Sequence, residues 1–299
     1  MRESWLKPEP SPTREPRPAC TMKDPIFDDR LATLRVERAA HMARDGANFL
    51  SEMAMHEMAD RLSVTNREFL RCVIISHDPA SVGILRSRLP ANAAGMEISL
   101  LSPADLLTTG DIFPGDETTD LFISPFGLHR INDLPGALAR LRRALKPDGL
   151  LMAALPGEGS FQELRDCLIL AESAQVGGAA MRVEPFIDIR QAGGLLQRAG
   201  FSLPVTDMEK LVLRYRSPMA LVSELRAMGS TSCMCTARRR ISRSIWAKTE
   251  ACYGSKYGDD DGRIRARLNI VYLTGWAPHE NQQKPLRPGS AQTSLKSVL

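Results

Sequence analysis

Apolar and polar positions along the chain follow two alternating periods. Short apolar runs predict buried strands at 72–75, where the run is β-branched, and at 98–101, 120–124 and 150–155. Between the last two runs, leucines recur every three or four positions from 134 to 145, which is the spacing of an amphipathic helix. Strands that alternate with helices predict an α/β domain with a mostly parallel sheet.

The second half of the chain continues this alternation. Asp188 is expected to cap a helix that ends near Ala199, and Ser217 followed by Pro218 is expected to begin another. Strands are predicted at 203–208, at 211–215 and, as the last element, at 266–276. We interpret the helices of 217–257 as a lid that is inserted before this last strand.

Both ends of the chain differ in composition from the body. Residues 1–25 hold six prolines, mix acidic with basic side chains and lack the apolar stretch of a secretory signal, so we expect a disordered tail. Residues 278–299 are expected to form a polar C-terminal tail, which leaves one domain over 26–277. Without a recognisable transit peptide, we expect a cytoplasmic protein.

The overall composition is that of a globular protein, with 43% hydrophobic and 25% charged residues. These values exclude a disordered chain, a collagen and a coiled coil. No apolar run approaches the ~20 residues that a membrane-spanning helix needs. The six cysteines form neither a C-x-x-C pair nor a zinc pattern, so we expect a reducing compartment and no metal site.

Charge is distributed unevenly. From residue 210 to the end there are 16 Lys and Arg against 6 Asp and Glu, a net charge of +10, whereas the whole chain carries +4. Arg239, Arg240 and Arg243 are candidates to bind an acidic protein partner or an anionic membrane surface. The alternative is an exposed helix face that only contacts water. No nucleic-acid-binding motif accompanies these residues, and we expect no DNA partner.

Several motifs carry a resemblance to a known family. The stretch 119–135, with its Leu-His-Arg-Ile-Asn-Asp core, and the Leu-Lys-Pro-Asp-Gly turn at 145–149 resemble class I S-adenosylmethionine-dependent methyltransferases. The segments 272–280 and 283–291, with 26–30 near the start, resemble more narrowly the branch of complex I assembly factors. That branch is related to the malonyl-carrier methyltransferase of the biotin pathway.

This resemblance implies a Rossmann-like domain with a seven-stranded, mostly parallel sheet whose last strand is antiparallel. It also implies S-adenosylmethionine at the carboxyl ends of the strands, where open α/β sheets bind their ligands. The implied function is methyl transfer to a protein partner, such as a complex I subunit.

The loop after the first strand departs from the family pattern. A glycine-rich turn is expected there, because glycines let the backbone approach the cofactor closely. The chain instead has Ser76, His77, Asp78 and Pro79, and glycine returns only at Gly83. The next strand ends in leucines rather than in the acid that holds a ribose. Two alternatives to a protein methyltransferase therefore remain: a cofactor-free assembly protein, and a methyltransferase for a small molecule or carrier protein.

The candidate site residues come from this loop and from the stretch around and after the strand at 120–124. If the cofactor binds, Ser76, His77, Asp78, Gly83 and Ser124 are the expected contacts. The candidate catalytic base is His129, because a histidine titrates near neutral pH and this one follows a central strand. Its alternative role is a hydrogen bond to a loop carbonyl.

Two further residues of the same stretch are candidates for contact with substrate or partner. Phe126 is expected either to form a wall of the pocket or to fill the core. Asn132 is expected either to bind substrate or, with Asp133, to cap the following helix.

Overall fold

The computed structural model describes residues 25–42, 46–89, 95–108, 117–236 and 240–283. The tail expected over 1–25 lies outside this part of the chain, except for Pro25. Most of the tail expected over 278–299 and the candidate residue Arg239 lie outside it as well.

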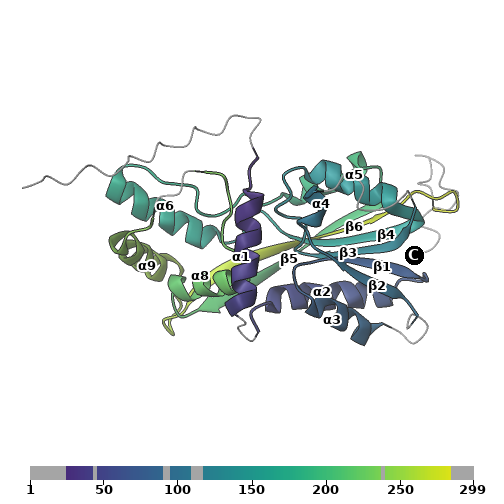
Figure 1. The fold of residues 1–299 in the computed structure, drawn as a ribbon. Helices are drawn as coiled ribbons and strands as arrows, with labels where there is room; N and C mark the ends of the chain where they lie inside the picture. Colours follow the sequence, from purple (N-terminus) through teal and green to yellow (C-terminus); the bar gives the residue numbers. More distant parts are fainter. Residues whose placement is uncertain (1–24, 43–45, 90–94, 109–116, 237–239, 284–299) are drawn as a thin grey trace, which may run out of the picture.

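A single sheet forms the centre of the described structure (Figure 1). Its strands follow the order β2-β1-β3-β4-β6-β5. Their bounds are β1 Arg71–Ile75, β2 Glu97–Leu101, β3 Thr119–Pro125, β4 Leu145–Pro156, β5 Ser202–Tyr215 and β6 Ile264–Trp276. Strands β1 to β4 are parallel, and β6 is antiparallel to both of its neighbours. The expected α/β class with an antiparallel last strand is confirmed, with six strands among the described residues where seven were expected.

The two strands expected at 203–208 and 211–215 are one strand, β5. It pairs with β6 from Ser202 opposite Trp276 to Tyr215 opposite Ile264, with one irregularity near its start. Glu209 and Lys210 lie between the two expected strands, and both side chains are exposed on this edge strand. The turn expected at 146–149 forms the irregular start of β4, where Asp148 adopts a positive φ of 63°.

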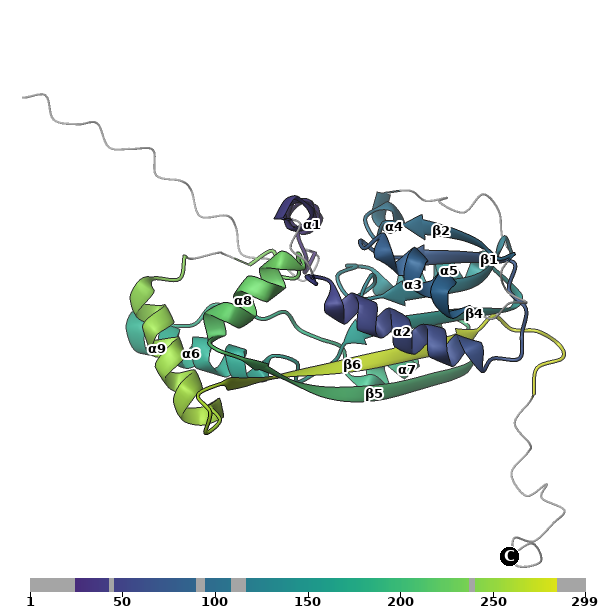
Figure 2. The same ribbon diagram turned by 90° about the horizontal axis from the view of Figure 1, so that it is seen from below.

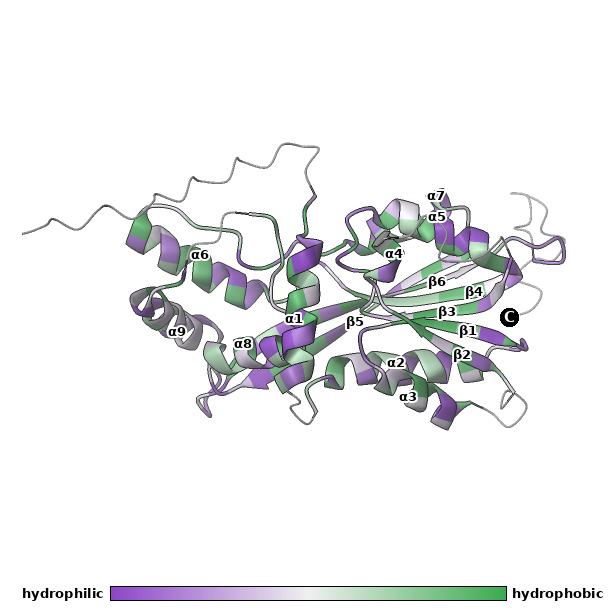
Figure 3. Ribbon diagram, in the orientation of Figure 1, coloured by the Kyte–Doolittle hydropathy of each residue, from purple (hydrophilic) through white to green (hydrophobic). Residues whose placement is uncertain are grey.

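Helices cover both faces of the sheet, and each face has its own hydrophobic core. The bounds are α1 Asp29–Met42, α2 Phe49–Ser63, α3 Ala80–Arg88, α4 Asp105–Thr108, α5 Leu134–Ala144, α6 Gln162–Val176, α7 Ile189–Arg198, α8 Pro218–Ala227 and α9 Arg243–Tyr257. Helices α2 and α3 pack together on one face, and α5 and α7 on the other. Figure 3 shows hydrophobic residues along β1 and β3, between these layers.

The predicted caps are present. The Asp188 carboxylate accepts hydrogen bonds from the amides of Arg190 and Gln191 at the start of α7. The Ser217 hydroxyl accepts one from the Ala220 amide at the start of α8. Both bonds satisfy amides that the first turn of a helix leaves without a partner.

Strands β5 and β6 extend beyond the rest of the sheet and carry a second group of helices (Figures 1 and 2). Helix α9 packs against α6 and α8 there, and we call α6, α8 and α9 the helical lobe. Helix α1 lies between this lobe and the sheet and has no buried residue. The segment expected to act as a lid therefore contributes α8 and α9 to this lobe, and its action as a lid stays a prediction.

Candidate functional site

A cavity of about 730 Å³ lies where the sheet, the helical lobe and α1 meet. The loop Ser76–Pro79 after β1 and the loop 125–131 after β3 line one side of it, and residues 181–186 and 227–236 line others. These two loops follow the carboxyl ends of parallel strands, which is where ligands bind in open α/β sheets. The volume is within the range of small-molecule sites.

The amides of the loop after β1 donate their hydrogen bonds to groups of the loop itself and to the end of β2. The Ser76 amide donates to the carbonyl of Leu101 at the end of β2 (3.1 Å), and the Asp78 amide donates to the Ser76 hydroxyl (3.0 Å). The Ala80 amide donates to Oδ1 of Asp78 (3.0 Å). Pro79 has no amide hydrogen to offer. The loop therefore does not form a cradle of free amides of the kind that a glycine-rich turn provides.

Asp78 is the most unusual polar group in the cavity wall. Its residue is only 8% exposed, and its Oδ2 is buried without a hydrogen-bond partner among the described residues. An unpaired buried acceptor is costly to a folded protein, and such an atom commonly indicates a role in binding or catalysis. Asp78 can therefore accept hydrogen bonds from a cationic ligand.

The usual contacts of S-adenosylmethionine are matched only in part. Ser76, His77 and Asp78 line the cavity, and the Asp78 carboxylate suits an ammonium group. Gly83 is exposed on α3 and does not line the cavity. Ser124 is buried and donates to the Ile75 carbonyl (3.3 Å), outside the lining. No acid stands at the end of β2 to hold a ribose.

His129 has both of its expected features: it lines the cavity and it bonds to a loop carbonyl. Its Nδ1 lies 2.8 Å from the Phe126 oxygen. Burial, with a smaller contribution from the Arg130 cation, lowers the pKa of His129 from 6.5 to about 4. The imidazole is therefore neutral at pH 7, with Nδ1 as the donor and Nε2 as a free acceptor.

The start of the same loop is held tightly against β1. A Cβ on Gly127 would lie 2.2 Å from the carbonyl oxygen of Ile75, so only glycine fits there. Phe126 precedes it with a positive φ of 55°, which is a strained backbone conformation for a side-chain-bearing residue. The Phe126 side chain lines the cavity and also packs against the core, and its contact with a substrate or partner stays a prediction.

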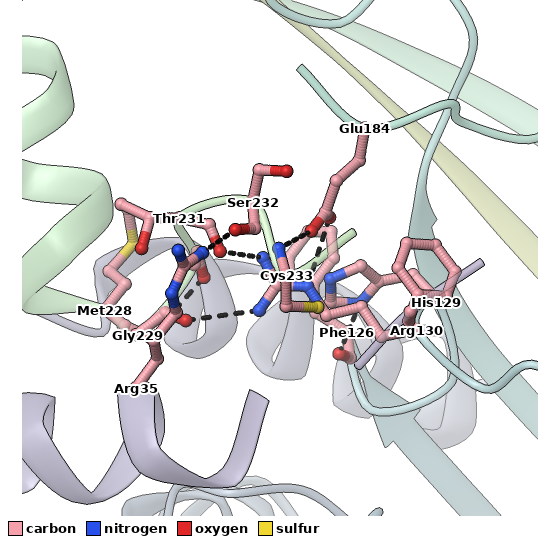
Figure 4. A network of polar contacts seen from close by, with 12 residues as sticks. Arg35, Phe126, His129, Arg130, Glu184, Met228, Gly229, Thr231, Ser232 and Cys233 are labelled. Carbon is pink, nitrogen blue, oxygen red and sulfur yellow. Dashed lines mark hydrogen bonds and ion pairs between the residues drawn. The ribbon is translucent and has the colours of Figure 1, made fainter. Parts of the chain in front are cut away.

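A network of charged and backbone groups encloses the cavity next to His129 (Figure 4). Arg130 donates to Oε2 of Glu184 (3.1 Å) and to the carbonyls of Gly229 (3.1 Å) and Thr231 (3.0 Å). The other oxygen of Glu184 accepts from the Cys233 amide (2.7 Å). We call residues 229–233 the strap, because they fold around the Arg130 guanidinium. Arg35 of α1 donates to the strap at the Ser232 carbonyl.

The sequence reasoning missed this network. Arg130 lies inside the motif that carries the resemblance, and this position is the only feature of the sequence that could have indicated a role for it. Glu184 is 54 residues away and follows no pattern that would pair it with an arginine.

Asn132, a candidate substrate contact, holds the start of α1. Its side-chain amide donates to the Phe27 carbonyl (3.0 Å) and to Asp29 (3.1 Å), and its oxygen accepts from the Phe27 amide (2.9 Å). The capping role belongs to Asp133 instead, whose carboxylate accepts from the Gly136 amide (2.9 Å). Asn132 therefore does not line the cavity itself, and it holds the start of α1, whose residues do.

The candidate basic face is described only in part. Arg240 and Arg243 are exposed near the start of α9. Elsewhere in the basic C-terminal third, Arg214 is neutralised locally by Asp259 (2.8 Å) and Asp261 (2.7 Å). Binding of a partner or membrane by the exposed arginines stays a prediction. In the part of the chain that the structure describes, no helix is long and apolar enough to cross a membrane. Nor do three His, Cys, Asp or Glu side chains there gather as metal ligands.

The chain is similar to proteins named arginine-hydroxylase NDUFAF5, mitochondrial. The Dictyostelium discoideum protein is 40% identical over 184 residues, which cover 61% of this chain and 42% of that protein. The Rattus norvegicus protein is 31% identical over 283 residues, covering 90% and 82%. The malonyl-[acyl-carrier protein] O-methyltransferase of Laribacter hongkongensis is 30% identical over 270 residues, covering 77% and 88%. No family model matches the chain.

Among solved structures, the chain is similar to the 1,6-didemethyltoxoflavin-N1-methyltransferase of Burkholderia thailandensis with bound S-adenosylhomocysteine. The TM-score is 0.44 and the identity 15%, over 90% of this chain and 94% of the other.

The chain spans about half the length of the Dictyostelium discoideum and Danio rerio proteins, at 42% and 57%. The expected cytoplasmic location is wrong, because these relatives are named as mitochondrial proteins.

Proposed function

Because the chain belongs to the family of NDUFAF5 arginine-hydroxylases, we propose that it assists complex I assembly by acting on an arginine side chain of a protein partner. The relatives' names supply the residue type and the mitochondrial compartment. The resemblance of the sequence motifs supplies the connection with complex I.

The buried carboxylate of Asp78 is the observation that carries this proposal. A guanidinium is a planar cation with five N–H donors, and it forms its strongest hydrogen bonds with carboxylates. Asp78 lines the cavity, and its buried Oδ2 has no hydrogen-bond partner among the described residues, so a turn of the carboxylate toward the cavity would let it receive those donors. Arg130 does not compete for it, since its guanidinium is bound to Glu184 and to the strap.

Hydroxylation is the reaction that the relatives' names state. It inserts one oxygen atom of dioxygen into a C–H bond of the arginine, while two electrons from a donor outside the protein and two protons reduce the other oxygen atom to water. Methyl transfer is the second candidate, favoured by the malonyl-carrier methyltransferase relative. Methylation of a nitrogen by S-adenosylmethionine breaks the methyl–sulfur bond, forms a methyl–nitrogen bond, leaves S-adenosylhomocysteine and releases a proton. Nε2 of the neutral His129 is an acceptor for that proton, although its low pKa makes it a weak base.

Mass spectrometry of complex I subunits, purified with and without co-expression of this protein, tests the proposal. An arginine that gains the mass of one oxygen atom identifies a hydroxylase, and the mass of one methylene group identifies a methyltransferase. An unmodified set of arginines would leave a non-catalytic assembly protein as the better description.

Asp78→Asn tests the guanidinium contact directly. A charged hydrogen bond contributes about 1.5–3 kcal/mol, so binding of an acetylated arginine amide should weaken by tenfold or more, measured by calorimetry. Asp60→Asn is the matched control, since Asp60 forms an exposed ion pair with Arg88 and does not line the cavity. Equal affinities for both variants and the parent protein would disprove the role of Asp78.

A further inference from the structure

The part of the cavity inside the helical lobe differs from the part at the strand ends. It is lined by apolar side chains, and we call it the apolar arm. Its members are Leu164 and Leu168 of α6, Val222 and Leu225 of α8, Trp246 of α9 and Leu268 of β6. The titratable groups Asp78 and His129 belong to the loops at the strand ends, on the sheet side of α1.

The apolar arm borders directly on the hydrophobic core. Leu164, Leu168 and Leu268 belong to the buried core cluster, and Val222 and Leu225 pack against it. On the outer side, α1 lines the cavity with the small or aliphatic residues Ala32, Val36, Ala39 and Ala40 and with the polar residues Asp29, Thr33 and Arg35. Space of this kind is unfavourable when empty and poorly suited to water, since the arm's own side chains offer a water few hydrogen-bond partners.

The lining also decides which kind of ligand fits. A peptide segment in the arm would bring backbone N–H and C=O groups into surroundings with few partners, and each unpaired group would oppose binding. An aliphatic chain has no such groups, and each buried CH₂ favours binding. A chain-like small molecule therefore fits the arm better than a protein segment does.

We propose that the apolar arm binds the aliphatic chain of a small amphipathic ligand, whose polar end lies toward the loops after β1 and β3. This goes beyond the proposed action on arginine and does not depend on it. The probes chosen to test it carry no guanidinium, so either proposal can fail while the other stands.

Tryptophan fluorescence supplies the test, because Trp246 lines the arm. Linear alcohols with a bromine at the far end of the chain should quench Trp246 saturably as the chain enters. Affinity should rise about fourfold for each added CH₂, which is about 0.8 kcal/mol, until the arm is full. Quenching that does not saturate, or does not depend on chain length, would overturn the proposal.

Two tryptophan variants assign the signal. The chain has tryptophans at 5, 246 and 276, and Trp276 does not line the cavity. Trp246→Phe should remove the saturable quenching, whereas Trp276→Phe should keep it. Saturable quenching that survives in Trp246→Phe would place the alcohol elsewhere and refute the assignment.

A filled arm gives an independent measurement. Val222→Phe and Leu225→Phe each add volume inside the arm and should weaken binding of the bromo-alcohol at least tenfold by calorimetry. Val212→Phe is the matched control, since Val212 is 57% exposed on β5 and outside the cavity. Unchanged binding in both filled variants would contradict the proposal. Should both fail to fold, the chain-length series on the parent protein decides.

Discussion

Replacing Glu184 by glutamine should lower the free energy of unfolding by about 3–5 kcal/mol, because it leaves the Arg130 cation buried without its counter-charge. The side chains of Arg130 and Glu184 are only 14% and 5% exposed, so water screens the pair poorly. Glutamine keeps the size of the side chain and an oxygen that can accept from the Cys233 amide. The change therefore removes the charge and the acceptor that faces Arg130, while it keeps the hydrogen bond from Cys233.

Urea unfolding, followed by circular dichroism, measures the effect. The matched control is Glu97→Gln in the pair of Arg71 with Glu97, whose side chains are 51% and 69% exposed. An exposed pair contributes about 0–1 kcal/mol, so the control should change stability by no more than that. If Glu184→Gln destabilises the protein no more than Glu97→Gln does, the Arg130 network does not have the structural role given to it here.

A double variant separates the loss of the pair from the loss of one partner. Arg130→Met combined with Glu184→Leu removes both charges and replaces them with apolar side chains of similar size. It should recover part of the stability lost in Glu184→Gln, since no uncompensated charge remains. Recovery should be incomplete, because the carbonyls of Gly229 and Thr231 lose their donor.

Two further predictions concern the neighbouring loop. His129 should titrate near pH 4 by NMR. Because its pKa is lowered in the folded state, its contribution to the free energy of unfolding is fully present above about pH 6.5 and is lost as the pH drops toward 4. A His129→Gln variant should lose that part of the pH dependence. Gly127→Ala should destabilise the protein or prevent folding, as its Cβ would lie 2.2 Å from the Ile75 oxygen, whereas Gly83→Ala, with open space around it in α3, should be neutral or stabilising by up to about 1 kcal/mol in thermal unfolding.

Much of the fold could be predicted from local patterns. The strand β1 and the caps at Asp188 and Ser217 follow from runs and residue types that act over a few positions. Strand β5 was not predicted as one element, because the charged pair Glu209 and Lys210 separates its two apolar runs. They continue the strand because its long pairing with β6 outweighs their low strand propensity.

The candidate site was predictable only where a loop follows a strand. Topology alone brings the loops that hold Asp78 and His129 to one edge of the sheet, since the carboxyl ends of parallel strands meet there. The unpaired oxygen of Asp78 depends on burial, and the contact of Arg130 with Glu184 joins residues far apart in the chain. Neither property has a local sequence pattern, so both needed the structure.

The loop after β3 shows why a conspicuous motif need not be wholly catalytic. His129 lines the cavity, Arg130 donates hydrogen bonds to the strap, and Asn132 binds the start of α1. The strap is also bound to the residue that precedes α1, since the Asp28 amide donates to the Cys233 carbonyl (2.8 Å). Three residues within four positions thus join the sheet, the strap and α1 into one enclosure. A substitution in this motif can therefore abolish binding by opening the cavity, and loss of activity assigns a chemical role only if the cavity is shown to remain closed.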